Sequence, residues 1–492
     1  MSTSRKLASD HPDAQRTQWN NFNFVTRVKA RSPESTFMLS HGTSSWITPV
    51  DLQLFSECAS AQDCYLNQIG GFSVSGSIGN KDPACVNIEF LIESSHPNIA
   101  AMQQQLLFPI SCKEPPSLKV VYTPNFSFPG FPSGRGVLLD LDNYVTRIFG
   151  TDYFGESKKA GLRMWNKWIF DRGGLALHAG CKTFESADKS LRSMLIIGLS
   201  GTGKTTTTFT PHSNSRPIQD DFCALFPGGS LFASENGCFA KTYGLDPDRE
   251  PLIFKGIAHQ NAWLENVYVD DLGAVDFFND AHTQNGRGTF ALDTIPHGNL
   301  NQIPPLAKIL ILNKDFNIIP AIARLNRSQA GAYFMLGETM GTSAGGDSEA
   351  GKALRVPGTN PFFPLDHALQ ANRFIELLKS SPDVEVYLLN TGHIGQDDLH
   401  HGGQKITIDH SKILIEAMLQ DRLKWKVDPD FGYEIVDDSN SPIDSVLTNP
   451  RSYYEGKGIV DVYENILARV IRDRLNYLDQ FKKIDEEIRH GI

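Results

Sequence analysis

The most informative chemical feature of the sequence is a glycine-rich segment that ends in lysine and threonine, MLIIGLSGTGKTTTTF. Gly198, Gly203, Lys204 and Thr205 stand in the spacing G-x-x-x-x-G-K-T, after an apolar strand-like run and before a helix start. Glycines let backbone N–H groups turn toward phosphate oxygens, the lysine reaches the outer phosphates, and the threonine hydroxyl can bind the metal ion of a nucleotide. The pattern therefore predicts a P-loop. The predicted nucleotide-binding residues of this loop are Gly198, Leu199, Ser200, Gly201, Thr202, Gly203, Lys204, Thr205 and Thr206.

A pair of carboxylates follows the loop in the segment PIQDD, as Asp220 and Asp221. Carboxylate oxygens are the ligands that Mg²⁺ prefers in proteins, and they also suit Mn²⁺. Adjacent acids are equally common in solvated turns. The pair by itself therefore leaves both a metal site and a surface turn open.

The overall composition restricts which classes of protein remain. Of the 492 residues 40% are hydrophobic, and 46 Lys and Arg oppose 56 Asp and Glu, for a formal charge of −10. This apolar content is too high for a disordered chain, and the acidic balance argues against a broad surface for nucleic acid or anionic membrane. We expect a folded globule that binds small molecules, with no nucleic acid and no membrane as partner, and with any positive site enclosed.

The start of the chain and its cysteines predict the compartment. The first twenty residues lack the apolar centre of a signal peptide, and no later stretch reaches the ~18 consecutive apolar residues of a membrane span. The seven cysteines are scattered and contain no C-x-x-C pair. We therefore expect a cytoplasmic protein with reduced thiols.

The elements that must position these groups follow from the apolar patterns. The segment GVLLDLDNYVTRIFG predicts a hairpin, and a helical pattern follows it over 157–170. From residue 194 onward, apolar runs such as AKILIL and VEVYLLN alternate with turn residues, which favours an α/β sheet covered by helices. We expect a boundary near residue 175, with an N-terminal substrate-binding domain over 1–175 and a C-terminal nucleotide-binding domain over 176–492.

Several blocks around the P-loop, taken together, resemble the ATP-dependent phosphoenolpyruvate carboxykinases, kinases that decarboxylate oxaloacetate and phosphorylate the resulting enolate. They include GTDYFGESKKAG, GLALHAG, the wording GLSGTGKTT, IQDDFCALF, GRGTF and GQKITIDHSKILIEAML, in collinear order from about residue 117 to 420. The resemblance implies a two-lobed α/β fold with mixed sheets and a P-loop mononucleotide-binding C-terminal domain. It also implies a mobile lid near 340–351.

The resemblance implies a role for metal ions on both sides of the site. Lys159, His178 and Asp221 would hold the Mn²⁺ that bridges substrate and nucleotide, while Thr205, supported by Asp220, would bind the Mg²⁺ of ATP. A lysine can bind a metal only as the neutral amine, so Lys159 must have a lowered pKa. His178 taken alone fits a hydrogen-bonded core histidine, and only the ordered combination of blocks favours a ligand.

The resemblance also assigns the groups that would contact the reacting molecules. Lys204 would hold the phosphates, and Arg287 would lie over the transferring phosphoryl group, where charge is shared in the transition state. Tyr153 would pack against the substrate carboxylate or CO₂. The predicted catalytic residues are Lys159, Lys204, Asp221 and Arg287, and the predicted substrate-binding residues are Arg31, Tyr153, Lys159 and Arg287.

Three positions depart from the pattern of that family. Arg31, in KARSPEST, is the counterpart of the family's oxaloacetate-binding arginine, but its flanking residues differ. On the nucleotide side Lys405 and Ser411 stand where the family has Arg and Thr. Because lysine cannot stack a planar guanidinium on adenine, contacts with the base must differ.

We therefore expect an enzyme that converts oxaloacetate and ATP reversibly into phosphoenolpyruvate, ADP and CO₂. Two alternatives stay open. The first is a related phosphotransferase that acts on another oxo-acid or uses another phosphate donor. The second is a non-catalytic nucleotide-binding protein. The oligomeric state cannot be predicted from these patterns.

Overall fold

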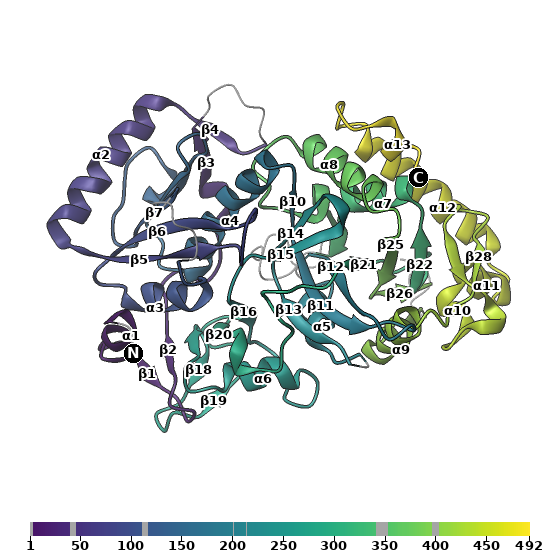
Figure 1. The fold of residues 1–492 in the computed structure, drawn as a ribbon, viewed down its shortest axis with the longest axis horizontal. Helices are drawn as coiled ribbons and strands as arrows, with labels where there is room; N and C mark the ends of the chain where they lie inside the picture. Colours follow the sequence, from purple (N-terminus) through teal and green to yellow (C-terminus); the bar gives the residue numbers. More distant parts are fainter. Residues whose placement is uncertain are drawn as a thin grey trace.

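The computed structural model describes residues 3–39, 46–110, 117–199, 201–212, 214–340, 353–395 and 403–492. The predicted lid at 340–351 lies outside these ranges except for its first residue, and Ser200 of the P-loop also lies outside them. The described part is a mixed α/β structure with several mixed sheets, as the alternating apolar patterns predict. Two large sheets dominate it and lie on opposite sides of the molecule (Figure 1).

The first large sheet has seven strands in the order β4-β3-β8-β9-β7-β6-β5. The predicted hairpin forms its centre, because β8 (Gly136–Asp140) pairs antiparallel with β9 (Val145–Phe149). Strands β6 (Val86–Glu93), β7 (Leu118–Thr123) and β9 run parallel, whereas β5 (Gly71–Ile78) is antiparallel to β6. The remaining strands are β3 (Thr36–Leu39) and β4 (Thr48–Val50). Helices α2 (Leu52–Ile69) and α3 (Pro97–Leu106) belong to the same half.

Helix α4 (Phe154–Asp171) connects this half to the rest of the chain. It starts three residues before the predicted helix, because Tyr153 is its N-cap and the buried Glu265 side chain accepts a hydrogen bond from the Phe154 N–H at 2.8 Å. A helix N-terminus leaves its first N–H groups without partners, so this acceptor stabilises the earlier start. The helix packs on β7 and β9 on one side and on β10 (Leu175–Leu177) on the other.

The second large sheet has eight strands in the order β13-β11-β12-β21-β25-β22-β29-β28. The predicted apolar runs form its parallel centre, which consists of β12 (Leu191–Ile197), β21 (Leu306–Asn313) and β25 (Glu385–Asn390). Burial of both faces explains their uninterrupted apolar sequences. Antiparallel strands flank this centre, namely β11 (Ala179–Glu185), β13 (Arg216–Gln219), β22 (Ile322–Leu325), β29 (Glu434–Val436) and β28 (Trp425–Val427).

A five-stranded sheet connects the first residues of the chain to its middle. Its order is β1-β2-β17-β20-β16, and β2 (Phe22–Phe24) runs parallel to β17 (Trp263–Glu265). The other strands are β1 (Gln15–Arg16), β20 (Arg287–Ala291) and β16 (Gly237–Lys241). The pairing places the segment after β2, which carries Arg31, beside residues far away in the sequence.

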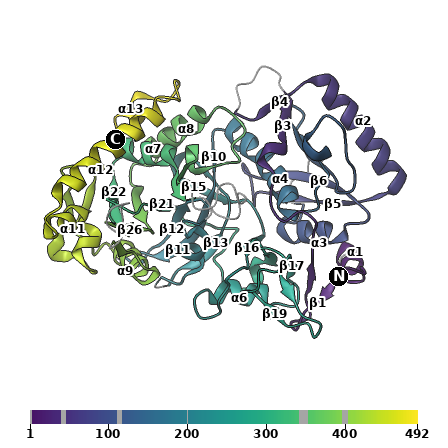
Figure 2. The same ribbon diagram turned by 180° about the vertical axis from the view of Figure 1, so that it is seen from behind.

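The C-terminal third combines helices with short strands, and its helical patterns after residue 405 form helices as predicted. Its main helices are α7 (Arg327–Leu336), α8 (His367–Lys379), α9 (Ile408–Leu419) and α12 (Val460–Leu478). From the opposite side α12 lies at the left edge of the molecule, beyond β22, whereas α7 and α8 lie nearer its middle (Figure 2). Among the described helices, none is both long and apolar enough to cross a membrane.

The prediction of reduced cysteines is wrong at one position. Cys85 is disulfide-bonded, whereas Cys58, Cys64, Cys181, Cys223 and Cys238 are free thiols. Sequence spacing cannot show this difference, because a disulfide requires two Cα atoms within about 7 Å and so depends on how distant segments approach each other.

Candidate active site

Of the three residues predicted to hold the substrate metal, Lys159 and His178 both contact the side chain of the third, Asp221. Lys159 Nζ, from α4, is 2.5 Å from Asp221 Oδ2, and His178 Nε2 is 3.2 Å from Asp221 Oδ1. His178 stands between β10 and β11, and Asp221 follows β13. The fold thus brings together donors from three separate segments. All three side chains are mostly buried.

The protonation of these three groups suits a divalent metal ion. Burial lowers the pKa of Lys159 to about 7, helped by the charges of Lys158 and Lys204 and opposed by Asp221. Burial also lowers the pKa of His178 to about 3, so its imidazole is neutral. Burial opposes ionisation of Asp221, but the neighbouring lysines, above all the charged Lys158, hold its pKa well below the usual range. An amine, an imidazole and a carboxylate, all available without a proton, form a suitable donor set.

A lysine donor distinguishes this set from an ordinary metal site. In the described part of the chain no group of three or more His, Cys, Asp or Glu is placed to hold a metal ion. The set of Lys159, His178 and Asp221 contains only two residues of those types. Its chemistry therefore depends on the lowered pKa of Lys159.

Lys158, the neighbour of Lys159, stays charged. Its Nζ forms ion pairs with Asp221 Oδ2 at 2.8 Å and with Glu235 Oε2 at 2.9 Å. Burial alone would lower the pKa of Lys158, but these two carboxylates raise it above the usual lysine value. Sequence reasoning gave Glu235 no role, although it opens the block ENGCFAKTYGL. The structure shows that the Glu235 carboxylate pairs with Lys158 and so belongs to the charge cluster around Asp221.

The glycine-rich loop has the backbone conformation that its sequence predicts. Gly201 and Gly203 have φ angles of 83° and 93°, which side chains disfavour. A Cβ at Gly198 would lie 2.6 Å from Thr202 Oγ1 and 3.1 Å from Leu312, so only glycine fits beside β21. Gly203 is the N-cap of the short helix α5 (Lys204–Phe209). The loop therefore turns sharply from β12 into α5.

One side chain of the loop, Lys204, contacts the same cluster. Lys204 Nζ donates to the backbone oxygen of Asp221 at 3.1 Å and lies 3.3 Å from its Oδ1. The Thr206 hydroxyl donates to Glu250 at 2.7 Å. The Thr205 hydroxyl has no hydrogen-bond partner within the described ranges, so it remains available for a ligand. Asp220 is buried, its Oδ1 has no hydrogen-bond partner, and burial raises its pKa.

A cavity of about 170 Å³ opens beside the loop, away from Asp221. It is lined by Gly203 and Thr206 from the loop and by Ser411 from α9, together with Lys314 and Lys412. Ser411 therefore lines a cavity beside the glycine-rich loop, and its contact with a nucleotide stays a prediction. Lys405 does not line this cavity, because it is exposed on β27 (Gln404–Lys405), which pairs with β26 (His393–Ile394). Lys314 and Lys412 lie outside the predicted set.

The residues predicted to bind substrate surround the other side of the cluster. Arg31 Cζ lies 4.6 Å from the centre of the Phe362 ring, and Lys159 Nζ lies 4.5 Å from the same ring. Arg287 and Tyr153 meet through Asn285, which accepts a hydrogen bond from Arg287 Nη2 at 2.8 Å and donates one to the Tyr153 hydroxyl at 3.3 Å. Neither Phe362 nor Asn285 was predicted. Phe362 stands in the run NPFFPLDHA and Asn285 directly before GRGTF, and no local signal distinguishes either residue within its run.

Several lysine and arginine side chains lie around this space. Lys158, Lys159, Lys204, Arg31 and Arg287 converge on it, opposed by the three carboxylates of Asp220, Asp221 and Glu235. Within the described residues, neither Arg31 nor Arg287 forms an ion pair with a carboxylate. The protein as a whole is acidic. Arg31 and Arg287 are therefore suited to binding anionic ligands.

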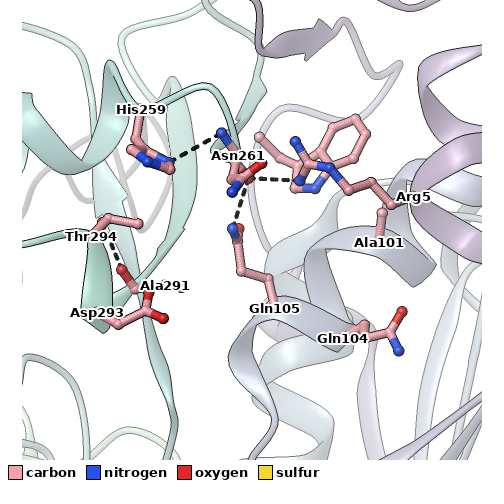
Figure 3. Close-up of a pocket in the computed structure, with 10 residues that line it drawn as sticks. Arg5, Ala101, Gln104, Gln105, His259, Asn261, Ala291, Asp293 and Thr294 are labelled. Atoms are coloured by element: carbon pink, nitrogen blue, oxygen red, sulfur yellow. Dashed lines mark hydrogen bonds between the residues drawn. The ribbon is translucent and has the colours of Figure 1, made fainter. Parts of the chain in front are cut away.

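A second cavity, of about 520 Å³, lies elsewhere, where α3 meets the end of β20 (Figure 3). Gln105 of α3 projects into it and donates to the backbone oxygen of Asn261 at 2.8 Å. Its walls include His259, Asp293 and Thr294. It contains no glycine-rich loop and none of the predicted site residues. Volume alone therefore does not favour this cavity over the charge cluster at Asp221 as the candidate active site.

Comparison with known proteins agrees with this geometry. Residues 4–442 match the phosphoenolpyruvate carboxykinase family. The phosphoenolpyruvate carboxykinase (ATP) of Aeropyrum pernix is 30% identical over 430 residues, which are 84% of this chain and 82% of that protein. The enzyme of the same name from Caldanaerobacter subterraneus is 27% identical over 96% of this chain and 91% of its own length. That from Shouchella clausii is 31% identical over 73% of this chain and 68% of its own.

The match covers both halves of the chain. It includes the segment with Arg31, the helix α4 with Lys159 and the loop with Lys204. The extent of the match and the identity over most of the chain lead to one conclusion. The chain belongs to the ATP-dependent phosphoenolpyruvate carboxykinase family, which is a family of enzymes.

Proposed function

We propose that the protein catalyses the reversible conversion of oxaloacetate and ATP into phosphoenolpyruvate, ADP and CO₂. One observation carries the assignment of the site: Lys159, His178 and the P-loop residue Lys204 all contact the side chain of Asp221. A phosphate-binding lysine and a metal-type donor set meet at one carboxylate. Such an arrangement supports a site in which the phosphoryl donor would lie next to the group that accepts the phosphoryl.

We assign the donor set of Lys159, His178 and Asp221 to Mn²⁺, and Thr205 with Asp220 to the Mg²⁺ of the nucleotide. A divalent ion bound to the first set supplies Lewis-acid stabilisation of negative charge on the enolate oxygen. Lys159 must be neutral to take part, and its pKa of about 7 makes the neutral amine available near neutral pH. The unpartnered Asp220 Oδ1 supports the second assignment.

On the substrate side, we assign Arg31 and Tyr153 to the carboxylates of oxaloacetate. The guanidinium of Arg31 has no acidic partner among the described residues, and it lies beside Lys159 on the Phe362 ring. A planar guanidinium forms two parallel hydrogen bonds with a carboxylate. Holding both carboxylates aligns the bond to CO₂ and keeps the resulting enolate in place.

On the phosphate side, we assign Lys204 and Arg287 to the phosphoryl group during transfer. Lys204 reaches Asp221 from the loop, and Arg287 is oriented by Asn285. Fixed cations on both sides of the transferring group stabilise the charge that it shares between the leaving and attacking oxygens. The backbone N–H groups of the glycine-rich loop hold the remaining phosphates.

The decisive experiment incubates the purified protein with oxaloacetate, ATP, Mg²⁺ and Mn²⁺ and quantifies phosphoenolpyruvate and ADP. Equal amounts of both products, absent without enzyme or without oxaloacetate, support the proposal. ATP hydrolysis without phosphoenolpyruvate contradicts it.

A second candidate is a related phosphotransferase with another phosphate donor or another oxo-acid. The nucleotide side favours it, because Lys405 is exposed and does not line the cavity that contains Ser411. The same assay with GTP, inorganic diphosphate and other 2-oxo acids separates the two candidates. The better kcat/KM identifies the substrate pair.

A further inference from the structure

The segment 26–32, which carries Arg31, lies against the start of α4. Both oxygens of the buried Asp152 side chain accept hydrogen bonds from this segment: Oδ2 from the Arg27 backbone N–H at 2.8 Å, and Oδ1 from the Val28 N–H at 2.9 Å. Asp152 is only 5% exposed. A buried carboxylate that accepts two backbone N–H groups fixes the path of that backbone, because leaving any of these groups without a partner is costly.

A second carboxylate holds the other end of the same segment. Glu156, in the first turn of α4, accepts a hydrogen bond from the Ser32 backbone N–H at 2.9 Å. Glu156 is 1% exposed. The Ser32 hydroxyl in turn accepts a hydrogen bond from Arg135 at 2.9 Å. The backbone is therefore held on both sides of Arg31.

The side chain of Arg31 contrasts with the backbone that carries it. Its guanidinium forms no hydrogen bond or ion pair within the described residues and lies 4.6 Å from the centre of the Phe362 ring. The backbone around Arg31 is fixed, while its donors remain available. This combination is what a preorganised anion site requires, because the cost of ordering the loop is met during folding rather than during binding.

We propose that Asp152 and Glu156 are positioning residues that hold the segment 26–32, so that Arg31 is in place for the substrate carboxylate before oxaloacetate binds. The inference rests on the proposed function, in which Arg31 binds that carboxylate. One short stretch of sequence, 152–159, thus carries both the predicted metal donor Lys159 and the groups that hold the substrate arginine. The start of α4 therefore positions both the arginine that binds oxaloacetate and the lysine of the metal site.

The kinetic test compares Asp152→Ala, Asp152→Asn and Glu156→Gln. Asp152→Ala removes both acceptors and is expected to raise the KM for oxaloacetate about tenfold, with the KM for ATP changed less than about twofold. Asn keeps one acceptor oxygen, so the KM of Asp152→Asn for oxaloacetate should lie between those of Asp152→Ala and the wild type. Gln keeps the acceptor used by Ser32, so Glu156→Gln should stay close to wild type.

A matched control is Asp270→Ala. Asp270 also accepts hydrogen bonds from two backbone N–H groups, those of Leu272 and Ala274, at 2.9 and 2.7 Å. It is exposed and belongs to the turn between β18 (Tyr268–Val269) and β19 (Val275–Asp276). Loss of this similar but remote contact should leave both KM values unchanged.

Two further measurements separate positioning from a general effect. In an Arg31→Ala background, Asp152→Ala should add no further increase in the KM for oxaloacetate, since Asp152 acts through Arg31. Amide hydrogen exchange should become faster over 26–32 in Asp152→Ala and stay unchanged over the glycine-rich loop. The proposal would be overturned if Asp152→Ala raised the KM for oxaloacetate as much in the Arg31→Ala background as in the wild type. Unchanged amide hydrogen exchange over 26–32 in Asp152→Ala would also overturn it.

Failure of the proposed function has a different signature. If the wild-type protein forms no phosphoenolpyruvate, or if Arg31→Ala leaves the KM for oxaloacetate unchanged, the assignment of Arg31 fails. Exchange over 26–32 does not depend on turnover. It therefore decides by itself whether the two carboxylates hold the segment.

Discussion

The two ends of the candidate site are built differently. At the metal end, Lys159, His178 and Lys204 are buried and directly contact Asp221. At the nucleotide end, a cavity of about 170 Å³ is lined largely by hydroxyl groups and lysine stems, and the predicted contact Lys405 lies outside it. Interactions between buried charges depend steeply on geometry, whereas an open polar cavity tolerates substitution. Substitutions should therefore impair catalysis strongly at the metal end and only weakly at the nucleotide end.

The largest expected effect is at the metal end. Lys159→Ala removes one donor of the proposed metal set and should lower kcat at least about 1,000-fold, because it weakens stabilisation of the enolate charge. ATP binding, measured by calorimetry with Mg²⁺, should change less than about threefold, since Lys159 is not part of the loop. Lys167→Ala is the control on the same helix, as its Nζ pairs with Asp171 at 2.6 Å. Full activity in Lys159→Ala would contradict the site.

The second effect concerns pH at the same end. Lys159 has a pKa of about 7, so its amine is neutral above that pH and protonated below it. His178 stays neutral because its pKa is about 3. A proton on Lys159 competes with the metal ion, so the Mn²⁺ concentration for half-maximal activity should rise about tenfold per pH unit below pH 7. Saturating Mn²⁺ should restore activity at pH 6. A requirement for Mn²⁺ that does not change from pH 8 to 6 would reject the neutral amine.

A smaller effect is expected from filling the cavity at the nucleotide end. Ser411→Leu adds volume where the cavity has about 170 Å³ and should raise the KM for ATP about tenfold, because the base loses room. The kcat at saturating ATP should stay within about twofold. Ser411→Ala, which keeps the space, is the control. Equal effects of the two variants would show that the hydroxyl matters more than the volume.

The smallest effect is expected at Lys405. Its side chain is exposed and outside the cavity, so Lys405→Ala should change the KM for ATP less than about twofold. A tenfold increase would instead place Lys405 on the bound nucleotide. It would also show that the nucleotide end closes when ATP binds.

Part of the fold and the site follows from local sequence. The glycines of the P-loop require φ angles that only glycine adopts readily, so their spacing predicts the turn into α5. The continuous apolar runs of β12, β21 and β25 predict buried parallel strands. The lowered pKa of Lys159 was expected once a metal role was inferred, because the role itself requires the neutral amine.

Other features depend on contacts that no local pattern encodes. Glu235, Phe362 and Asn285 contact site residues only because distant strands and loops meet there. The disulfide bond of Cys85 could not be predicted for the same reason. The division of the chain at residue 175 stays a prediction. Strands β1 and β2, from the first residues, pair within the sheet that contains β16, β17 and β20.

The sequence by itself determined the chemical groups: a glycine-rich loop with the pattern of a P-loop, and a lysine, a histidine and a carboxylate of types that can bind a metal. Their types and order are covalent facts, and short-range backbone preferences suffice to shape the loop. Only the tertiary structure decided that three lysines contact Asp221 and that Asp152 and Glu156 accept hydrogen bonds from the segment of Arg31. Burial sets the pKa values and hydrogen bonds of these groups, and burial exists only once distant segments have packed together.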